Sequence, residues 1–217
     1  MLSDFRLALR HLTKSPGFTF VAVATLALCI GANSAIFSVI NAVLLRPFPF
    51  PQSEQLVYVN NSYPKNDLLK AGVSIPDYLD RMERAPSIED GAIYSWENFN
   101  LSSDAQPERV LGLKAAPSLF STLRIAPLLG RVFTAEEAEI GQDKVVVLSH
   151  ALWAETFGSR ESILDETIRL NGNVYRVIGV MPPAFEFPAP WVKLWVPFAF
   201  TEEQKSINER GNEYSDM

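Results

Sequence analysis

Ser149 and His150 are neighbours in the sequence and are the residue types of a nucleophile and its general base. A serine hydroxyl attacks a substrate when a base such as imidazole is placed to take its proton. Adjacent positions point in different directions, however, and the pair follows the apolar run at 145–148. We therefore expect Ser149 to cap a helix that begins at His150. A hydrolase that uses this pair is the alternative.

The acidic cluster of Glu136, Glu137 and Glu139 is a second group whose residue types suit chemistry, because clustered carboxylates can bind a cation. Acidic residues are also favoured in the first turn of a helix, and Thr134 precedes them as a cap. We therefore expect a solvated helix turn here and no cation site.

The sequence lacks the residue patterns of most metal and cofactor sites. The two histidines lie 139 positions apart, and a single cysteine excludes an intramolecular disulfide or a cysteine-rich metal site. The sequence contains neither a phosphate-binding loop nor a Gly-x-Ser-x-Gly motif. We expect a protein without catalytic residues, without a metal and without a cofactor.

The charge balance of the sequence argues against one class of partner, nucleic acid. The 217 residues include 19 Lys and Arg against 25 Asp and Glu, a net charge of −6. Nucleic-acid binding needs clustered cations to neutralise phosphates, so we expect no nucleic acid as a partner. Hydrophobic residues make up 47% and charged residues 20%, which is typical of a folded chain.

An uncharged run of 28 residues occupies 18–45. About 20 apolar residues suffice to span a bilayer as a helix, so 18–45 is predicted to be a transmembrane helix in contact with lipid. Residues 1–46 carry four cations and one acid, and residues 47–217 carry fifteen cations and twenty-four acids. The positive-inside rule then places the N-terminus in the cytoplasm and the residues after the span outside it. A cleaved signal peptide is the rival, but the apolar run resumes at 36–45 after the small residues at 31–35.

Residues 1–17 precede this span. Apolar residues recur here at helical spacing, and the arginines fall outside the face that they form; these apolar residues are Leu2, Phe5, Leu9 and Leu12. The pattern predicts an amphipathic segment along the cytoplasmic interface, and a plain basic flank is the alternative.

Within the span, Ala27, Gly31 and Ala35 are spaced by four residues. Small residues in such a row let helix backbones approach closely in lipid, and a polar residue such as Asn33 prefers a protein partner over hydrocarbon. We predict that these four residues pack against another helix. The alternative is the ordinary Gly and Ala content of any transmembrane helix.

Residues 46–217 are predicted to form an α+β domain. Alternate prolines at 47–51 end the first helix. Strands are expected at 56–59, 91–101, 108–115, 144–149, 166–170, 173–181 and 194–198, and helices at 76–84, 118–123 and 150–157. Asn171-Gly172 predicts a tight hairpin turn. Strands and helices are mixed without a regular βαβ rhythm, which favours α+β.

The order of several stretches resembles the N-terminal part of MacB/FtsX-type ABC transporter permeases with their MacB-like periplasmic core domain, and within them the duplicated ADOP-type permeases of Acidobacteria. These stretches are TLALCIGANSAIFSVINAVLL (25–45), RPFPF (46–50), PLLGRVFT (127–134), VLSHALW (147–153), RLNG (169–172) and VIGVMPP (177–183).

The resemblance implies a bacterial inner-membrane permease subunit that is not itself an enzyme. A separate cytoplasmic ABC ATPase hydrolyses ATP, and the dimeric permease relays the movement to its periplasmic domains. The implied partners are that ATPase, a second permease copy or half, and a periplasmic adaptor with an outer-membrane channel. The implied function is macrolide export, lipoprotein release or mechanotransmission.

Family permeases carry further transmembrane helices after the core domain. After residue 45 the longest apolar runs, 145–148 and 178–181, are far below the length of a span. We therefore expect a truncated permease with an incomplete core domain. A membrane-tethered single-pass sensor whose exported domain binds a ligand is the remaining alternative, beside the hydrolase.

Overall fold

The computed structural model describes residues 14–41, 50–102, 107–211 and 215–217. The chain divides into two compact units, Met1–Phe48 and Pro49–Met217. The segment predicted to lie along the membrane at 1–17 falls mostly outside the described residues, as does the end of the predicted span at 42–45.

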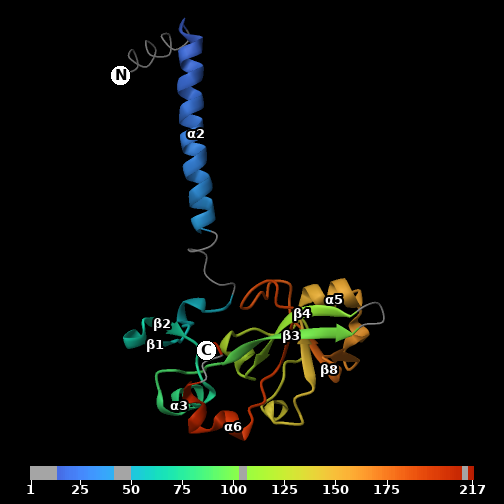
Figure 1. Cartoon of the computed structure of the whole chain (residues 1–217). Coiled ribbons are helices and arrows are strands. Elements are labelled where there is room, and N and C mark those ends of the chain that lie inside the picture. Colours follow the sequence, from blue (N-terminus) through green and yellow to red (C-terminus); the bar gives the residue numbers. More distant parts are fainter. Residues whose placement is uncertain (1–13, 42–49, 103–106, 212–214) are drawn as a thin grey trace. The chain divides into compact units, whose positions relative to one another are not determined.

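Unit 1 contains the helix α2, Pro16–Ile40 (Figure 1). It begins two residues before the predicted start, because Pro16 occupies the first turn, where a missing N–H costs nothing. At 1.5 Å per residue its 25 residues extend over roughly 38 Å, more than the roughly 30 Å of a bilayer core. Among the described residues, α2 is the one helix long and apolar enough to cross a membrane.

Unit 2 is a mixed α/β fold, which confirms the predicted α+β class. Its strands are β1 (Asn61–Tyr63), β2 (Leu68–Ala71), β3 (Tyr94–Ser102), β4 (Glu108–Ala115), β5 (Leu129–Gly130), β6 (Val145–Leu148), β7 (Thr167–Leu170), β8 (Asn173–Val180) and β9 (Leu194–Pro197). Its α-helices are α3 (Ile75–Arg84), α4 (Leu119–Thr122), α5 (His150–Phe157) and α6 (Glu202–Lys205). Its 3₁₀ turns are η2 (Ser53–Gln55), η3 (Pro64–Asn66), η4 (Glu136–Ala138), η5 (Glu161–Ile163) and η6 (Ile207–Gly211).

Seven strands form one sheet in the order β5-β8-β6-β9-β4-β3-β7. Strand β7 pairs antiparallel with both β3 and β8, so six of the strands close into a ring. Two pairings are parallel, β4 with β9 and β6 with β8, and the others are antiparallel. Ring closure satisfies strand edges that an open sheet would leave unpaired.

The central strands β6 and β9 are buried on both faces. Val145 and Val147 of β6 join one hydrophobic cluster, whereas Val146 and Leu148 join a second. Successive side chains of a strand point to opposite faces, so a continuous apolar run marks a strand covered on both sides. The run at 145–148 was predictable from sequence for this reason.

The turn between β7 and β8 is formed by Asn171 and Gly172, with φ of 49° and 80°. Two consecutive positive φ values characterise the type I′ turn, as the Asn-Gly pair predicts. The Asn171 side chain also accepts a hydrogen bond from the N–H of Asn100 at 2.9 Å, which joins the turn to β3.

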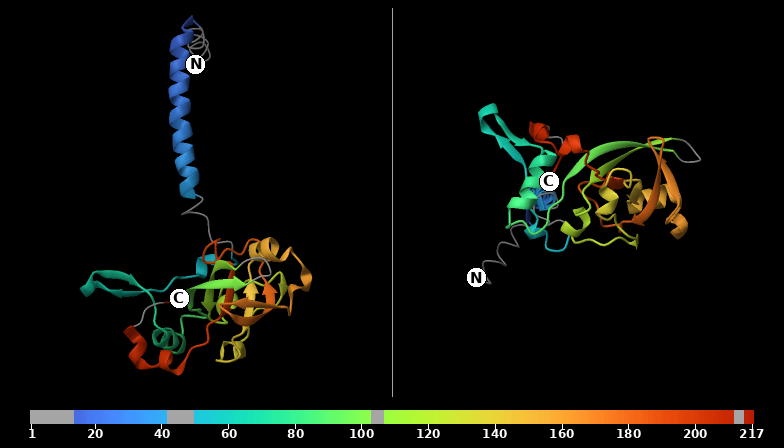
Figure 2. Two further views of the ribbon diagram at one scale, coloured as in Figure 1. Left: turned by 45° about the vertical axis from the view of Figure 1, so that its right-hand side comes forward. Right: turned by 90° about the horizontal axis from the view of Figure 1, so that it is seen from below.

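A smaller layer of unit 2 consists of the β1–β2 hairpin and α3. Figure 2 shows the hairpin projecting from the rest of the unit. The predicted strand at 56–59 is wrong: these residues run outside any strand, and Val59 makes one backbone bond, to the carbonyl of Met217.

Gly179 of β8 lies where the carbonyl of Arg131 approaches the strand. A Cβ at this position would come 2.2 Å from that oxygen. Gly179→Ala is expected to lower the free energy of unfolding by about 1–3 kcal/mol, because backbone must move to admit the methyl group.

Urea unfolding in detergent, followed by tryptophan fluorescence, measures this loss. Gly211→Ala is the matched control, since a Cβ there meets nothing within 4 Å. Equal stability of the two variants would contradict the close approach at Gly179.

Candidate functional site

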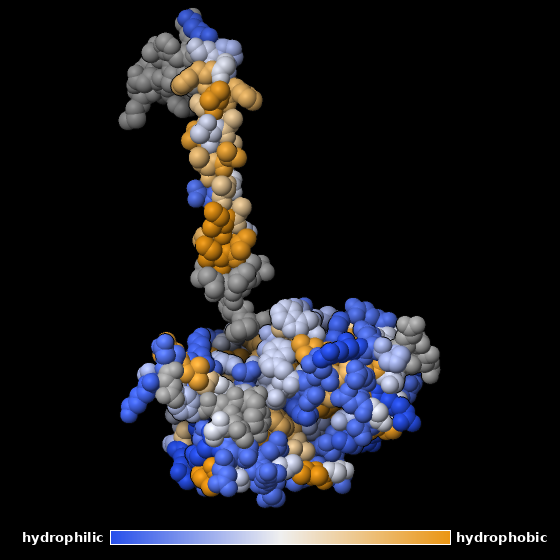
Figure 3. Space-filling model, in the orientation of Figure 1, coloured by the Kyte–Doolittle hydropathy of each residue, from blue (hydrophilic) through white to orange (hydrophobic). Residues whose placement is uncertain are grey.

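No residue of α2 is buried, all but Thr19 and Ala22 are exposed, and none of its most apolar window is buried within the structure. Figure 3 shows hydrophobic residues along most of this helix, whereas the visible surface of unit 2 is mainly hydrophilic. An apolar helix of this length without protein cover fits lipid as its surroundings.

The predicted packing residues of α2 occupy two sides of the helix. At 100° per residue, Ala27 and Ala35 each lie about 40° from Gly31, on one face, whereas Asn33 lies about 160° away. A Cβ on Gly31 would meet nothing within 4 Å, so this face is open among the described residues. The Asn33 amide donates to the carbonyl of Cys29 at 3.0 Å, which satisfies one of its polar groups within the helix itself.

Ser149 and His150 perform the structural role expected of them. The Ser149 hydroxyl accepts a hydrogen bond from the N–H of Leu152 at 3.1 Å and caps α5. The serine residue is 6% exposed, and the His150 ring contacts Trp153 edge-on at 5.5 Å. In the described parts of the chain, no hydrogen bond joins this serine to its neighbour's imidazole. The geometry is that of a helix cap.

The acidic cluster is also structural. The predicted helix turn forms as a 3₁₀ turn with Glu136 and Glu139 exposed, whereas Glu137 is engaged by other residues of the chain. Glu136 and Glu137 lie in the 3₁₀ turn η4, and the Glu137 carboxylate is bonded at both oxygens to Arg131, at 2.7 Å each. It further accepts from the N–H of Thr134 at 3.0 Å. No cluster of three metal-ligating side chains occurs within residues 14–41, 50–102, 107–211 and 215–217.

The bond from Arg131 lowers the pKa of Glu137, with the Thr134 N–H acting in the same direction. A group whose pKa is depressed by folding stabilises the fold above its unfolded pKa, and the contribution disappears as the pH falls through the folded value. Glu137 therefore stabilises unit 2 at neutral pH and loses this effect in acid.

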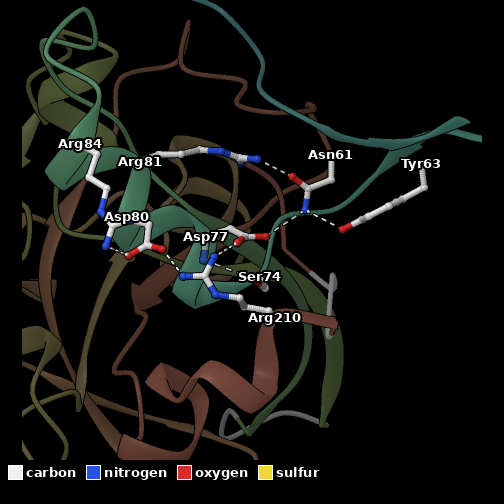
Figure 4. Close-up of polar contacts among 8 residues, drawn as sticks. All are labelled: Asn61, Tyr63, Ser74, Asp77, Asp80, Arg81, Arg84 and Arg210. Carbon is white, nitrogen blue, oxygen red and sulfur yellow. Dashed lines mark hydrogen bonds and ion pairs between the residues drawn. The ribbon is translucent and has the colours of Figure 1, made fainter.

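A third cluster, which the sequence did not reveal, surrounds helix α3 (Figure 4). We call it the α3 cluster, formed by Asn61, Ser74, Asp77, Asp80, Arg81, Arg84 and Arg210. Ser74 caps α3 by accepting from the N–H of Asp77 at 3.3 Å. The Arg210 guanidinium donates to Asp77 at 2.9 Å and to Asp80, which joins η6 to α3 across 130 to 133 positions of the chain.

Strand β1 enters the same α3 cluster through Asn61. Its amide donates to Asp77 at 3.2 Å, and its oxygen accepts from Arg81. Arg210, foremost among several causes, lowers the pKa of Asp80 by hydrogen bonding. Two acids at 77 and 80 and two arginines at 81 and 84 fall on one face of the predicted helix, but nothing in the sequence pointed to their partners at 61 and 210.

Residues 215–217 form what we call the terminal clasp. The carbonyl of Ser215 accepts from the N–H of Val73 at 2.7 Å, and Asp216 exchanges two backbone bonds of 2.8 Å with Tyr94. The carbonyl of Met217 accepts from Val59 at 2.9 Å. The clasp therefore connects the segment that enters unit 2, the start of α3 and strand β3.

The Asp216 side chain strengthens the terminal clasp. Its carboxylate accepts from the Tyr58 hydroxyl and, at 3.2 Å, from the Trp96 indole N–H. Burial, followed by this hydrogen bond, raises the pKa of Tyr58, so the tyrosine remains a neutral donor. These donors lie 158 and 120 positions away in the chain.

Residues 19–215 match the sequence model of the MacB-like periplasmic core domain. The chain belongs to this family. The match confirms the resemblance drawn from its sequence stretches, and domains of this family are parts of ABC transporter permeases. The terminal clasp, the α3 cluster and most of α2 all fall within the matched residues or directly beside their end.

Three solved structures are similar to this MacB-like chain. The periplasmic region of MacB from Actinobacillus actinomycetemcomitans has 16% identity and a TM-score of 0.49, covering 73% of this chain and 70% of its own. The extracellular domain of the transporter YknZ from Gram-positive bacteria has 15% identity and a TM-score of 0.47, covering 64% and 70%. A domain of a permease protein from Porphyromonas gingivalis has 15% identity and a TM-score of 0.48, covering 67% and 60%. No curated protein matches the chain.

Glu137→Gln tests the bond between η4 and the end of β5. The amide keeps an acceptor but loses the charge, so unit 2 is expected to lose about 1–2 kcal/mol of unfolding free energy at neutral pH. This loss should be constant above about pH 5 and shrink as the pH falls below the unfolded value of 4.5.

A pH series of urea unfolding curves measures this dependence. Glu139→Gln is the control, from the same acidic cluster. A difference between wild type and Glu137→Gln that persists unchanged into acid would show that the charge of Glu137 does not stabilise the fold.

Proposed function

We propose that this chain is the first transmembrane helix and periplasmic core domain of an ABC transporter permease, of the kind that exports macrolides, releases lipoproteins or transmits force to the periplasm. The observation that carries the proposal is the extent of the family match. It runs from Thr19 in α2 to Ser215 in the terminal clasp, so one family unit includes both the apolar helix and the folded domain.

In this proposal the chain relays motion. A separate cytoplasmic ATPase hydrolyses ATP, and the movement reaches unit 2 through α2 and the residues after it. Phe50 supports this role because it is 6% exposed and packs on Phe185 at 5.9 Å and on Phe187 at 6.0 Å. A pull on this residue acts on the hydrophobic core of unit 2, because Phe50 belongs to that core.

The terminal clasp supports the same proposal. Val59, in the segment that comes after Phe50, is bonded to Met217, and Tyr94 of β3 is bonded to Asp216. A displacement of the entering segment is therefore passed by short backbone bonds to the sheet. Such coupling between segments far apart in sequence is what a mechanical element requires.

Two other functions compete with the relay. A membrane-tethered hydrolase would need Ser149 as its nucleophile, and the hydroxyl of Ser149 is already engaged as the cap of α5. A single-pass sensor needs an anchor alone, whereas the open small-residue face of α2 suits contact with another helix. Both features favour the permease.

The proposed partners are those that this role requires. They are the cytoplasmic ABC ATPase, a second permease copy or half, and a periplasmic adaptor with an outer-membrane channel, with lipid around α2. The proposed location is the bacterial inner membrane with the N-terminus in the cytoplasm, as the +3 charge of residues 1–46 and the −9 charge of residues 47–217 favour.

Fusion of reporters after Met217 tests the orientation. Alkaline phosphatase fused there is expected to be active, and a cytoplasmic-type fluorescent protein fused there is expected to be dark, because the fusion point is exported. The reversed pattern would place unit 2 in the cytoplasm.

Leucine substitutions on the small-residue face test the permease role. Gly31→Leu and Ala35→Leu keep α2 apolar, so insertion is expected to proceed as in wild type. Lipid tails give helices no hydrophobic reason to associate, so association depends on close backbone approach. The variants should reach the membrane at normal levels and yet co-purify poorly with the ATPase.

The control is Ala32→Leu, which adds bulk about 100° from both Gly31 and Asn33 on the helix. Membrane content by immunoblot and the amount of bound ATPase are measured together for all three variants. If all three bind the ATPase equally well, the row is background composition and the single-pass tether is favoured.

A further inference from the structure

The loop at 182–192 carries an exposed tryptophan on a rigid turn. The N–H of Val192 donates to the carbonyl of Ala189 at 3.1 Å, which places Pro190 and Trp191 at the two central positions. Proline is favoured at the first of these positions because its φ is already set for the turn. Trp191 is 61% exposed, whereas Ala189 and Val192 beside it are buried. The turn is thus held firmly while its largest side chain faces outward.

The same loop anchors the point where the chain enters unit 2. Phe185 and Phe187 are the rings on which Phe50 packs. Figure 1 and Figure 2 show the loop, in orange-red, at the edge of unit 2 where residues 50–55 also lie. The loop that carries Trp191 therefore lies at the edge of unit 2 that contains Phe50.

The tether is short. Eight residues separate Asn41 from Phe50, and a fully extended chain of this length spans about 30 Å. A domain of the size of unit 2 is about 40 Å across. Covalent connection alone thus keeps the edge with Phe50 within reach of the bilayer surface.

The composition of the loop fits that surface. Residues 182–192 contain a single charge, Glu186, together with two phenylalanines and the tryptophan. Tryptophan is enriched at membrane–water interfaces, where its ring lies among lipid and its indole N–H remains hydrated.

We propose that Trp191 inserts into the head-group region of the bilayer and docks this edge of unit 2 on lipid. The inference rests on the proposed function, because it requires α2 to span the membrane. It goes further by assigning a second, interfacial contact between the chain and lipid. This contact limits how unit 2 can tilt when the tether moves.

The sequence offers a clean spectroscopic test, because α2 has no tryptophan and all four tryptophans (96, 153, 191 and 195) lie in unit 2. The full chain is reconstituted in phosphatidylcholine vesicles doped with a lipid that carries a spin label near its head group. Spin labels quench fluorescence at short range, so quenching reports contact of unit 2 with lipid. Wild type is expected to be quenched, and Trp191→Phe is expected to lose most of this quenching.

Trp96→Phe is the matched control, since Trp96 is also exposed, at 41%, but lies on β3. It should retain the quenching of wild type. Equal quenching in both variants, or none in wild type, would overturn the proposal. Protection of Trp191 from aqueous acrylamide without lipid quenching would overturn it in favour of a protein partner.

Two further measurements separate this inference from the proposed function. Flotation of the vesicles after an alkaline wash reports whether α2 is inserted. If the chain is not recovered with the lipid, the proposed function fails; if it is inserted but Trp191 is not quenched, only the interfacial contact fails. Matching thermal unfolding curves confirm that the variants are folded, as expected for an exposed side chain.

Discussion

Burial of β6 and β9 on both faces is the constraint on which the rest of unit 2 depends. Val147 and Trp195, which lie opposite each other across these strands, belong to one hydrophobic cluster, whereas Leu148 and Leu194 belong to the other. A slip of one residue would exchange the contents of the two clusters, which differ in size and shape. The strand pair is therefore fixed in register, and helix α5 and the aromatic residues pack on a defined surface.

On one face of the β6–β9 pair, aromatic rings connect the centre of unit 2 with Phe50. Trp195 contacts Phe185 at 5.0 Å, and Phe185 contacts Phe50 at 5.9 Å. Two ring contacts thus lead from a central strand to the first described residue of unit 2. Closely packed interiors transmit displacement with little compression, so in the proposed role a movement of Phe50 would reach the sheet through these rings.

Local signals in the sequence predicted the parts of the fold that depend on neighbouring residues. The apolar run at 145–148, the Asn171-Gly172 turn and the Ser149 cap each rest on contacts within a few positions, and each was predictable. The predicted strand at 56–59 was wrong, and the backbone bond that Val59 does make is to Met217, more than 150 residues away. Of the candidate sites, too, only the one that depends on nearby residues could be found from the sequence. The small-residue row of α2 can be found from spacing alone, since helix geometry places residues four apart on one face. The α3 cluster and the terminal clasp cannot, because Arg210 and Asp216 acquire their partners only when the chain has folded.

The two units are stabilised by different physical effects, and this difference bears on how the chain works. Hydrophobic burial stabilises the fold of unit 2 in water. Polar contacts of Glu137, Asp77 and Asp216 join separate segments of the unit. In a bilayer α2 would gain nothing by burying leucine against leucine, so the proposed association with another helix rests on its small-residue face. In the proposed role, a domain with fixed internal register would follow a movement of the helix to which it is attached as one body. Catalysis is not needed for such a role, and the residues that looked reactive in the sequence, Ser149 and His150, are instead part of what makes the body rigid.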